Sequence, residues 1–128
     1  ICGQCALARN GLTTQNPTHL DVWTSIKEID GVDAAIIRYI FNDKIDHVYE
    51  VHPMMSNSNL LLPTRERAIV EYVLCERWRD EGTLIEALKT YLWNFNDLPH
   101  LYEVADFFGL NKIELDFWIN EAITDEEI

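Results

Sequence analysis

The hydrophobic pattern of this chain changes at Pro63, and this change limits the folds that the chain can adopt. Before Pro63, apolar residues alternate with polar ones in short runs, which is typical of β-strands. After Pro63, apolar residues recur every three or four positions, which is typical of amphipathic helices. We therefore expect an α+β fold in a single domain, with an α/β lobe in residues 1–62 and a helical lobe in residues 63–128.

The N-terminal lobe is expected to hold one short helix and a small mixed β-sheet. Ala6 and Leu7 lie in the expected helix, which ends at Gly11 because glycine adopts the left-handed conformation without steric cost. Runs rich in β-branched and aromatic residues follow and predict strands. These runs are residues 20–24, 34–41, 48–51 and 60–62. The sequence does not determine the order of the strands.

The C-terminal lobe is expected to contain four helices. Thr64 can cap the first, which carries apolar residues around nearly its whole circumference and should therefore be buried. Thr83 and Glu86 have the spacing of a capping box for the second helix. The third helix is expected to end at Gly109, and the fourth is expected to start at Asn111.

The charge of the chain argues against nucleic acid as a partner. The formal net charge is −12, and residues 63–128 hold six basic against fifteen acidic side chains. An acidic surface is repelled by phosphate, which Lys and Arg normally neutralise. Residues 104–111 resemble the turn of a helix-turn-helix, but the helix that would read DNA carries Glu114, Asp116 and Glu121 with only Lys112 to offset them. We expect a structural hairpin there, although a helix-turn-helix regulator remains an alternative.

Cysteine usage indicates a reducing compartment. The chain has three cysteines, no apolar export signal and no long apolar run, so we expect a cytoplasmic protein that does not enter a membrane. Cys2 and Cys5 form a C-x-x-C pair, but a zinc site needs two further ligands and a redox pair usually follows a strand. We expect both cysteines to behave as small apolar side chains.

No catalytic motif is present in the sequence. It contains no H-E-x-x-H, no glycine-rich phosphate loop and no G-x-S-x-G, and its four histidines are expected to be structural. The nearest approach to a reaction centre is the pair Asp21 and Glu50, whose carboxylates could bind a hard metal ion in a metal-dependent nuclease. His52 stands where such a nuclease would have lysine. We expect a protein that is not an enzyme and has no cofactor or metal, with the nuclease as the alternative.

Four blocks of the sequence together resemble a known family. The blocks are residues 3–7 (Gly-Gln-Cys-Ala-Leu), 11–17, 20–25 and 62–68. In this order they resemble the C-terminal domain of the AbiEi antitoxins, which belong to type IV toxin–antitoxin and abortive-infection (phage defence) systems, and the resemblance covers most of the chain. It implies an antitoxin that counteracts a nucleotidyltransferase-type toxin, an antagonism that does not require a stable complex. It also implies an upstream winged helix-turn-helix that binds the operon's promoter. That module is absent from this chain, and a start at Ile1 fits a fragment.

The expected interaction surface has two parts, a polar turn and a charged helix start. The residues are Thr13, Thr14, Gln15 and Asn16 in the turn, and Arg65 and Arg67 at the helix start. Turns held by a rigid scaffold often carry binding groups, although a turn with satisfied backbone groups explains the first set equally well. Arg67 matches an arginine of the family and lies on a helix that we expect to be enclosed. A buried arginine requires a carboxylate partner.

Overall fold

A computed structural model describes the backbone of residues 3–13, 20–24, 33–34, 37–41, 49–53, 61–74 and 80–124, and the side chains of residues 6–13, 49–51, 62–74 and 80–124. Its helices are α1 (Gly3–Arg9), α2 (Arg65–Leu74), α3 (Glu81–Asn94), α4 (Leu98–Phe107) and α5 (Lys112–Thr124). Its strands are β1 (Leu20–Thr24), β2 (Asp33–Ala34), β3 (Ile37–Phe41), β4 (Val51–Pro53) and β5 (Leu61–Pro63).

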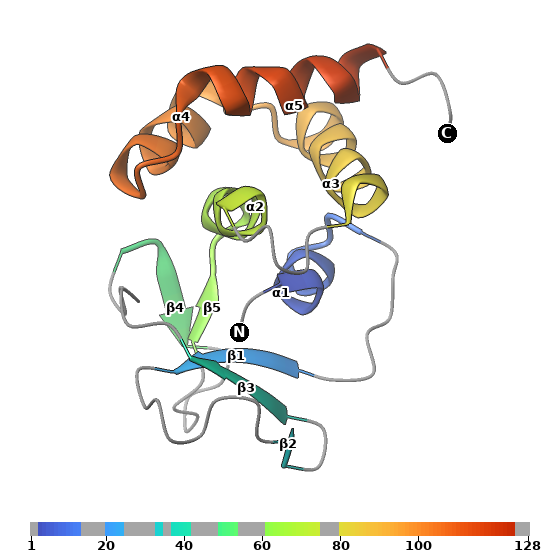
Figure 1. Cartoon of the computed structure of the whole chain (residues 1–128). Coiled ribbons are helices and arrows are strands. Elements are labelled where there is room, and N and C mark those ends of the chain that lie inside the picture. The colour runs from blue at the N-terminus through green and yellow to red at the C-terminus, as the bar shows by residue number, and fades with distance from the viewer. Residues whose placement is uncertain are drawn as a thin grey trace.

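Helix α2 lies at the centre of the molecule. It is flanked by α1, α3 and α4, and α5 runs across the far side of α3 and α4 (Figure 1). Every residue of α2 from Glu66 to Val73 is buried. The expectation of an enclosed helix is therefore confirmed, and the reason is the one given by the sequence: a helix that is apolar on most sides needs neighbours on most sides.

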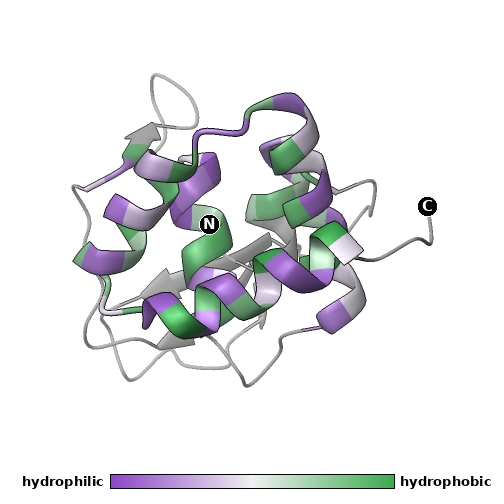
Figure 2. Ribbon diagram, turned by 90° about the horizontal axis from the view of Figure 1, so that it is seen from above, coloured by the Kyte–Doolittle hydropathy of each residue, from purple (hydrophilic) through white to green (hydrophobic). Residues whose placement is uncertain are grey.

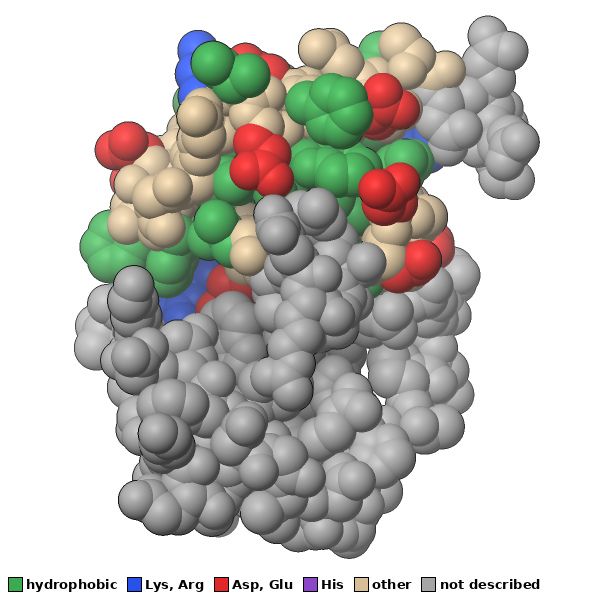
Figure 3. Space-filling model, viewed as in Figure 1, with side chains coloured by type: hydrophobic (Ala, Val, Ile, Leu, Met, Phe, Trp, Pro, Cys, Tyr) green, Lys and Arg blue, Asp and Glu red, His purple; other side chains and the backbone are tan. Residues whose placement is uncertain are grey.

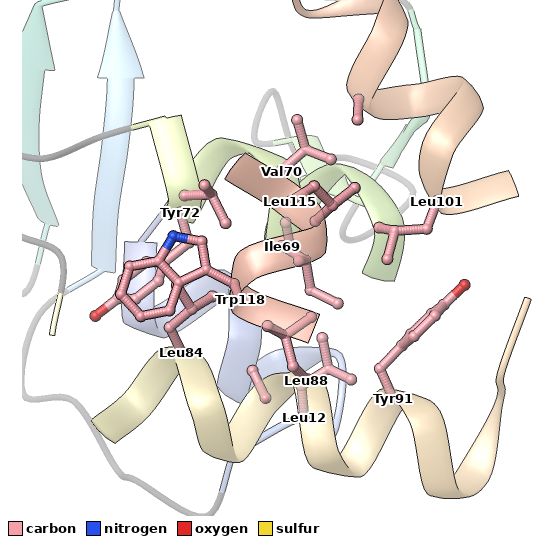
Figure 4. Close-up of a cluster of buried hydrophobic side chains, with 14 of the residues drawn as sticks. Leu12, Ile69, Val70, Tyr72, Leu84, Leu88, Tyr91, Leu101, Leu115 and Trp118 are labelled. Carbon is pink, nitrogen blue, oxygen red and sulfur yellow. The ribbon is translucent and has the colours of Figure 1, made fainter. Parts of the chain in front are cut away.

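The described core is built from helices and the loops next to them. Figure 4 shows side chains from α2, α3 and α5 that point into one cluster, among them Ile69, Leu88 and Trp118. Ala6 and Leu7 of α1 and Leu12 just after it belong to the same cluster. The N-terminal helix is thus part of the same core as α2, α3 and α5.

The predicted fold class, α+β with a small mixed β-sheet, is wrong. Of the residues described in full, 74% are helical, and only a few belong to a strand. The described strands are two to five residues long and fall into separate groups. A strand of this length presents one to three side chains to one face, whereas the longer helices carry wide apolar stripes that bury one another around α2. Among the residues described in full, helices therefore make up most of the structure, in place of the predicted sheet.

The backbone pairing of these short strands is simple. Strand β1 runs parallel to β3, with Leu20 opposite Ile37, and β2 pairs antiparallel with the start of β3. Strands β4 and β5 form a separate antiparallel pair, with His52 opposite Leu62. Strand β5 leads directly into α2, so this pair sets the position at which α2 begins.

Most helix ends lie where the sequence placed them, with one exception. Gly11 has φ +73° just after α1, and the Thr64 hydroxyl accepts the backbone N–H of Arg67 at 3.4 Å. Asn111 caps α5 by accepting the N–H of Ile113 at 2.8 Å. The predicted capping box at the start of α3 is wrong. The cap is Asp80, whose carboxylate accepts the backbone N–H of Thr83 at 3.0 Å.

Helices α4 and α5 form a helical hairpin that a side-chain hydrogen bond stabilises. The chain turns at Gly109, which has φ +76°, and the Tyr102 hydroxyl of α4 donates a hydrogen bond to Asp116 of α5. Burial, followed by this bond and the charge of Asp116, raises the pKa of Tyr102 to about 12. The ribbon seen from above shows hydrophilic and hydrophobic residues alternating along the helices (Figure 2). Within the described chain, every helix is too short or too polar to cross a membrane.

Candidate functional site

Two carboxylates and one imidazole converge at the side of α2. Glu50, Glu66 and His100 each direct one possible metal-ligand atom to a region where these atoms lie within 4.8 Å of one another. The residues come from the turn before β4, from the first turn of α2 and from the first turn of α4. Packing of α4 and the turn against α2 therefore creates a cluster that is not contiguous in the sequence.

Glu50 is fixed by the residue that precedes α2. Its carboxylate Oε2 accepts a hydrogen bond from the Thr64 hydroxyl at 2.7 Å, and its carbonyl accepts the Thr64 N–H at 2.9 Å. Glu50 has φ +56°, in the left-handed region that costs a non-glycine residue about 1 kcal/mol. The two bonds to Thr64 hold the turn in this conformation, so the position of the carboxylate is well defined.

Glu66 is almost fully enclosed, with an exposed fraction of 5%. The Tyr91 hydroxyl of α3 lies 2.8 Å from Glu66 Oε2 and 2.8 Å from the carbonyl of Asp97. Because this hydroxyl has one proton, it donates to one of the two acceptors at a time. Burial, the bond to Glu66 and the nearby negative charges raise the pKa of Tyr91, which stays protonated. Tyr91 therefore joins the site to α3.

His100 completes the cluster. Its Nε2 lies 3.1 Å from Glu50 Oε1 and 3.9 Å from Glu66 Oε1. Burial lowers the pKa of His100, but the hydrogen bond to Glu50 and the charges of Glu50, Glu66 and Asp97 outweigh it, so the pKa is raised. Asp97 also caps α4 by accepting the His100 N–H at 3.4 Å. The arrangement can therefore share a proton between imidazole and carboxylates or bind a cation.

Arg67 supports the same turn from the other side. Its Nη1 donates to the Tyr49 carbonyl at 2.7 Å, and its Nε lies 3.2 Å from Glu71 Oε2. The guanidinium also lies over the Phe108 ring, 4.9 Å from the centroid. Burial raises the pKa of Glu71 to about 7, against the opposing effect of Arg67. The predicted carboxylate partner of Arg67 is therefore Glu71, and the prediction is confirmed.

The residues of the predicted interaction surface do not form one exposed group in the described structure. Arg67 is 4% exposed and Thr13 is 8% exposed, so neither offers its side chain to a partner. Arg65 lies with its guanidinium 3.9 Å from the Phe95 ring centroid. Neither its buried Nε nor the buried Thr13 hydroxyl has a hydrogen-bond partner among the described residues. Thr14, Gln15 and Asn16 lie outside the described residues.

The sequence identified only one member of the cluster. Glu50 was considered as a metal ligand, but with Asp21, whose side chain lies outside the described residues. His100 was expected to be structural, and Glu66 was not among the candidate ligands predicted from the sequence. The packing of α4 on α2 brings the two residues together, and no sequence motif indicates this contact.

The comparisons with known proteins identify no family. The chain matches no protein-family model, no curated protein and no solved structure.

Proposed function

We propose that this chain is the antitoxin domain of an AbiEi-like toxin–antitoxin system and that it counteracts a nucleotidyltransferase-type toxin. The observation that supports the proposal is the contact between the N-terminal region that holds the first two blocks and the last block. The Asn10 side-chain amide, between the first and second blocks, donates to the Pro63 carbonyl, in the last block, at 3.0 Å. Helix α1 packs on α2 at the same place.

The domain acts by presenting its exterior, without a reaction of its own. Acidic and apolar side chains lie next to one another on the helical face drawn in Figure 3. Large apolar residues are exposed there and on neighbouring helix faces; they include Trp93, Ile113 and Phe117. Exposed apolar groups among charges favour contact with a protein over contact with nucleic acid. Binding to the promoter is therefore assigned to an upstream winged helix-turn-helix, and the place of action is the cytoplasm.

Co-expression with the toxin tests this proposal directly. A bacterium that expresses the neighbouring nucleotidyltransferase toxin is given this chain, or the chain with Leu88→Asp as a control. Leu88 is fully buried in the core, so a carboxylate there should unfold the protein. We expect growth to be restored by the natural chain and not by the control. Failure of the natural chain to restore growth, while its circular dichroism shows a folded helical protein, would overturn the proposal.

A further inference from the structure

We propose that Glu50, Glu66 and His100 bind one divalent transition-metal ion, Zn²⁺ or Mn²⁺. One nitrogen and two oxygen donors suit these ions, because imidazole favours the first-row transition metals and carboxylates are also accepted by zinc and manganese. The inference goes beyond the antitoxin function, and the geometry of the donors carries it.

The two carboxylates are oriented for a shared ligand. In each one, Oε2 is contacted by a protein hydroxyl, that of Thr64 for Glu50 and that of Tyr91 for Glu66. The other oxygen, Oε1, faces Nε2 of His100 in both cases. Hydrogen bonds that fix the outer atom of a ligand are the usual supporting contacts of a metal site. One possible ligand atom of each of the three residues therefore faces the same place.

Among the described residues, the Glu66 oxygen that faces the site has no hydrogen bond. Glu66 is 5% exposed, its Oε2 is bonded by Tyr91, and its Oε1 lies 3.9 Å from His100 Nε2. That distance is too long for a hydrogen bond. A cation at this place would be bound by a carboxylate oxygen of an enclosed residue that faces two other donor atoms.

The charge balance of the site leads to the same conclusion. Among the described residues, the ion-pair partner of Glu50 and of Glu66 is His100, and the nearby Arg67 is engaged by Glu71. One imidazolium between two carboxylates leaves a net negative charge next to the enclosed Glu66. A divalent ion bound to a neutral His100 would compensate both carboxylates.

The site is accessible and leaves room for a further ligand. The side chains of His100 and Glu50 are 31% and 18% exposed, against 7% for Glu66, so the cluster opens on the side of His100. Donor atoms that each lie about 2.0–2.2 Å from a zinc ion are about 3.4 Å apart in a tetrahedral site. The distances of 3.1 Å and 3.9 Å from Nε2 bracket this value. Three protein donors would leave one position for water or for an atom of a partner. The ion would hold the turn at Glu50 to α2 and α4.

Titration with ZnCl₂ and MnCl₂ tests the site in the full chain. Isothermal titration calorimetry at pH 7.5 is expected to give one ion per chain for at least one metal, with a dissociation constant in the micromolar range or below, and a rise in melting temperature. His100→Gln and Glu66→Gln are each expected to weaken binding at least tenfold. The control is Glu121→Gln, which removes an exposed carboxylate of α5 and should leave the affinity unchanged.

The variants separate this site from other metal-binding groups of the chain. His100→Gln keeps a hydrogen-bond donor near Glu50 at a partly exposed position, so it should fold even where Glu66→Gln does not. The proposal is overturned when the natural chain binds neither ion at millimolar concentration. It is equally overturned when a folded His100→Gln variant binds the ion as tightly as the natural chain. Cleavage of labelled DNA by the loaded protein, lost in His100→Gln, would support the site and contradict the non-enzymatic function.

Discussion

Arg67 and Glu71 form a buried ion pair one helical turn apart in α2, with 3.2 Å between Nε and Oε2. Their side chains are 4% and 5% exposed. The same guanidinium donates to the Tyr49 carbonyl at 2.7 Å, directly before the turn residue Glu50. The pair therefore joins the central helix to the turn that carries one side of the candidate metal site, and it makes the stability of the fold and the geometry of the site depend on one another.

Removal of the arginine is expected to destabilise the protein strongly. In Arg67→Met, Glu71 loses its partner and the Tyr49 carbonyl loses its donor, which should lower the free energy of unfolding by about 3 kcal/mol. Urea denaturation followed by circular dichroism measures this change. The double variant Arg67→Met, Glu71→Leu should recover part of the loss, since it leaves no unpaired charge. Equal stability of the double and single variants would show that the pair is not coupled.

The stability is also expected to depend on pH through Glu71. Burial raises the pKa of Glu71 to about 7 in the folded chain, so the folded state binds the proton more tightly than the unfolded state. This contribution to stability is fully present below the unfolded pKa and is lost as the pH rises through about 7. Glutamine does not titrate. The free energy of unfolding of Glu71→Gln, measured relative to that of the natural protein, should therefore rise by on the order of 1–3 kcal/mol from pH 5 to pH 8. Urea midpoints at both pH values measure it, and a difference that moves in the opposite direction would show that Arg67 lowers the pKa more than burial raises it.

The start of α3 gives a third prediction. The Asp80 carboxylate accepts from the N–H and the hydroxyl of Thr83, at 3.0 Å and 2.6 Å, so Asp80→Ala should cost about 1 kcal/mol. The hydroxyl bond, followed by the backbone bond, lowers the pKa of Asp80, and the stabilisation it reflects is present at neutral pH and lost as the pH falls through that pKa. Glu81→Gln is the matched control, because it removes a neighbouring exposed charge and leaves the cap in place. Thermal denaturation at pH 7 compares the two, and equal losses would argue against the cap.

The sequence predicted features that depend on nearby residues and missed those that depend on packing. The need of Arg67 for a carboxylate follows from its burial, and Glu71 lies four residues on, where helical neighbours meet. The start of α3 was misplaced because Asp80 and Thr83 are both good caps. Asp80 is the cap in the structure, because its carboxylate accepts hydrogen bonds from both the N–H and the hydroxyl of Thr83. Such a choice between overlapping caps is not contained in their spacing.

The prediction of the fold class and the missed metal site also depend on packing, here between residues far apart in the sequence. Strand-like runs before Pro63 are local signals, and their contribution to a fold depends on tertiary packing. In the described part of the chain, the core is formed by helices that pack on one another. The candidate metal site requires three residues separated by 16 and 34 positions to meet. Only the packing of α4 and of the turn at Glu50 against α2 brings them together, so no spacing rule could have identified His100 and Glu66.

At two glycines, the backbone conformation decides whether substitution by alanine lowers or raises the stability. Gly109 has φ +76° between α4 and α5, and a Cβ there would meet no atom within 4 Å. Gly109→Ala should therefore lower the free energy of unfolding by about 1 kcal/mol through conformational strain, without a steric clash. Gly82, in the first turn of α3, does not have positive φ, and its added Cβ would lie 3.7 Å from the nearest atom, Asp80 Oδ2, an ordinary contact. Gly82→Ala should raise stability by about 0.4–1 kcal/mol, because alanine restricts the unfolded chain. Chemical denaturation of both variants measures the two effects, and a loss of stability in Gly82→Ala that equals the loss in Gly109→Ala would contradict the assignment of the left-handed turn.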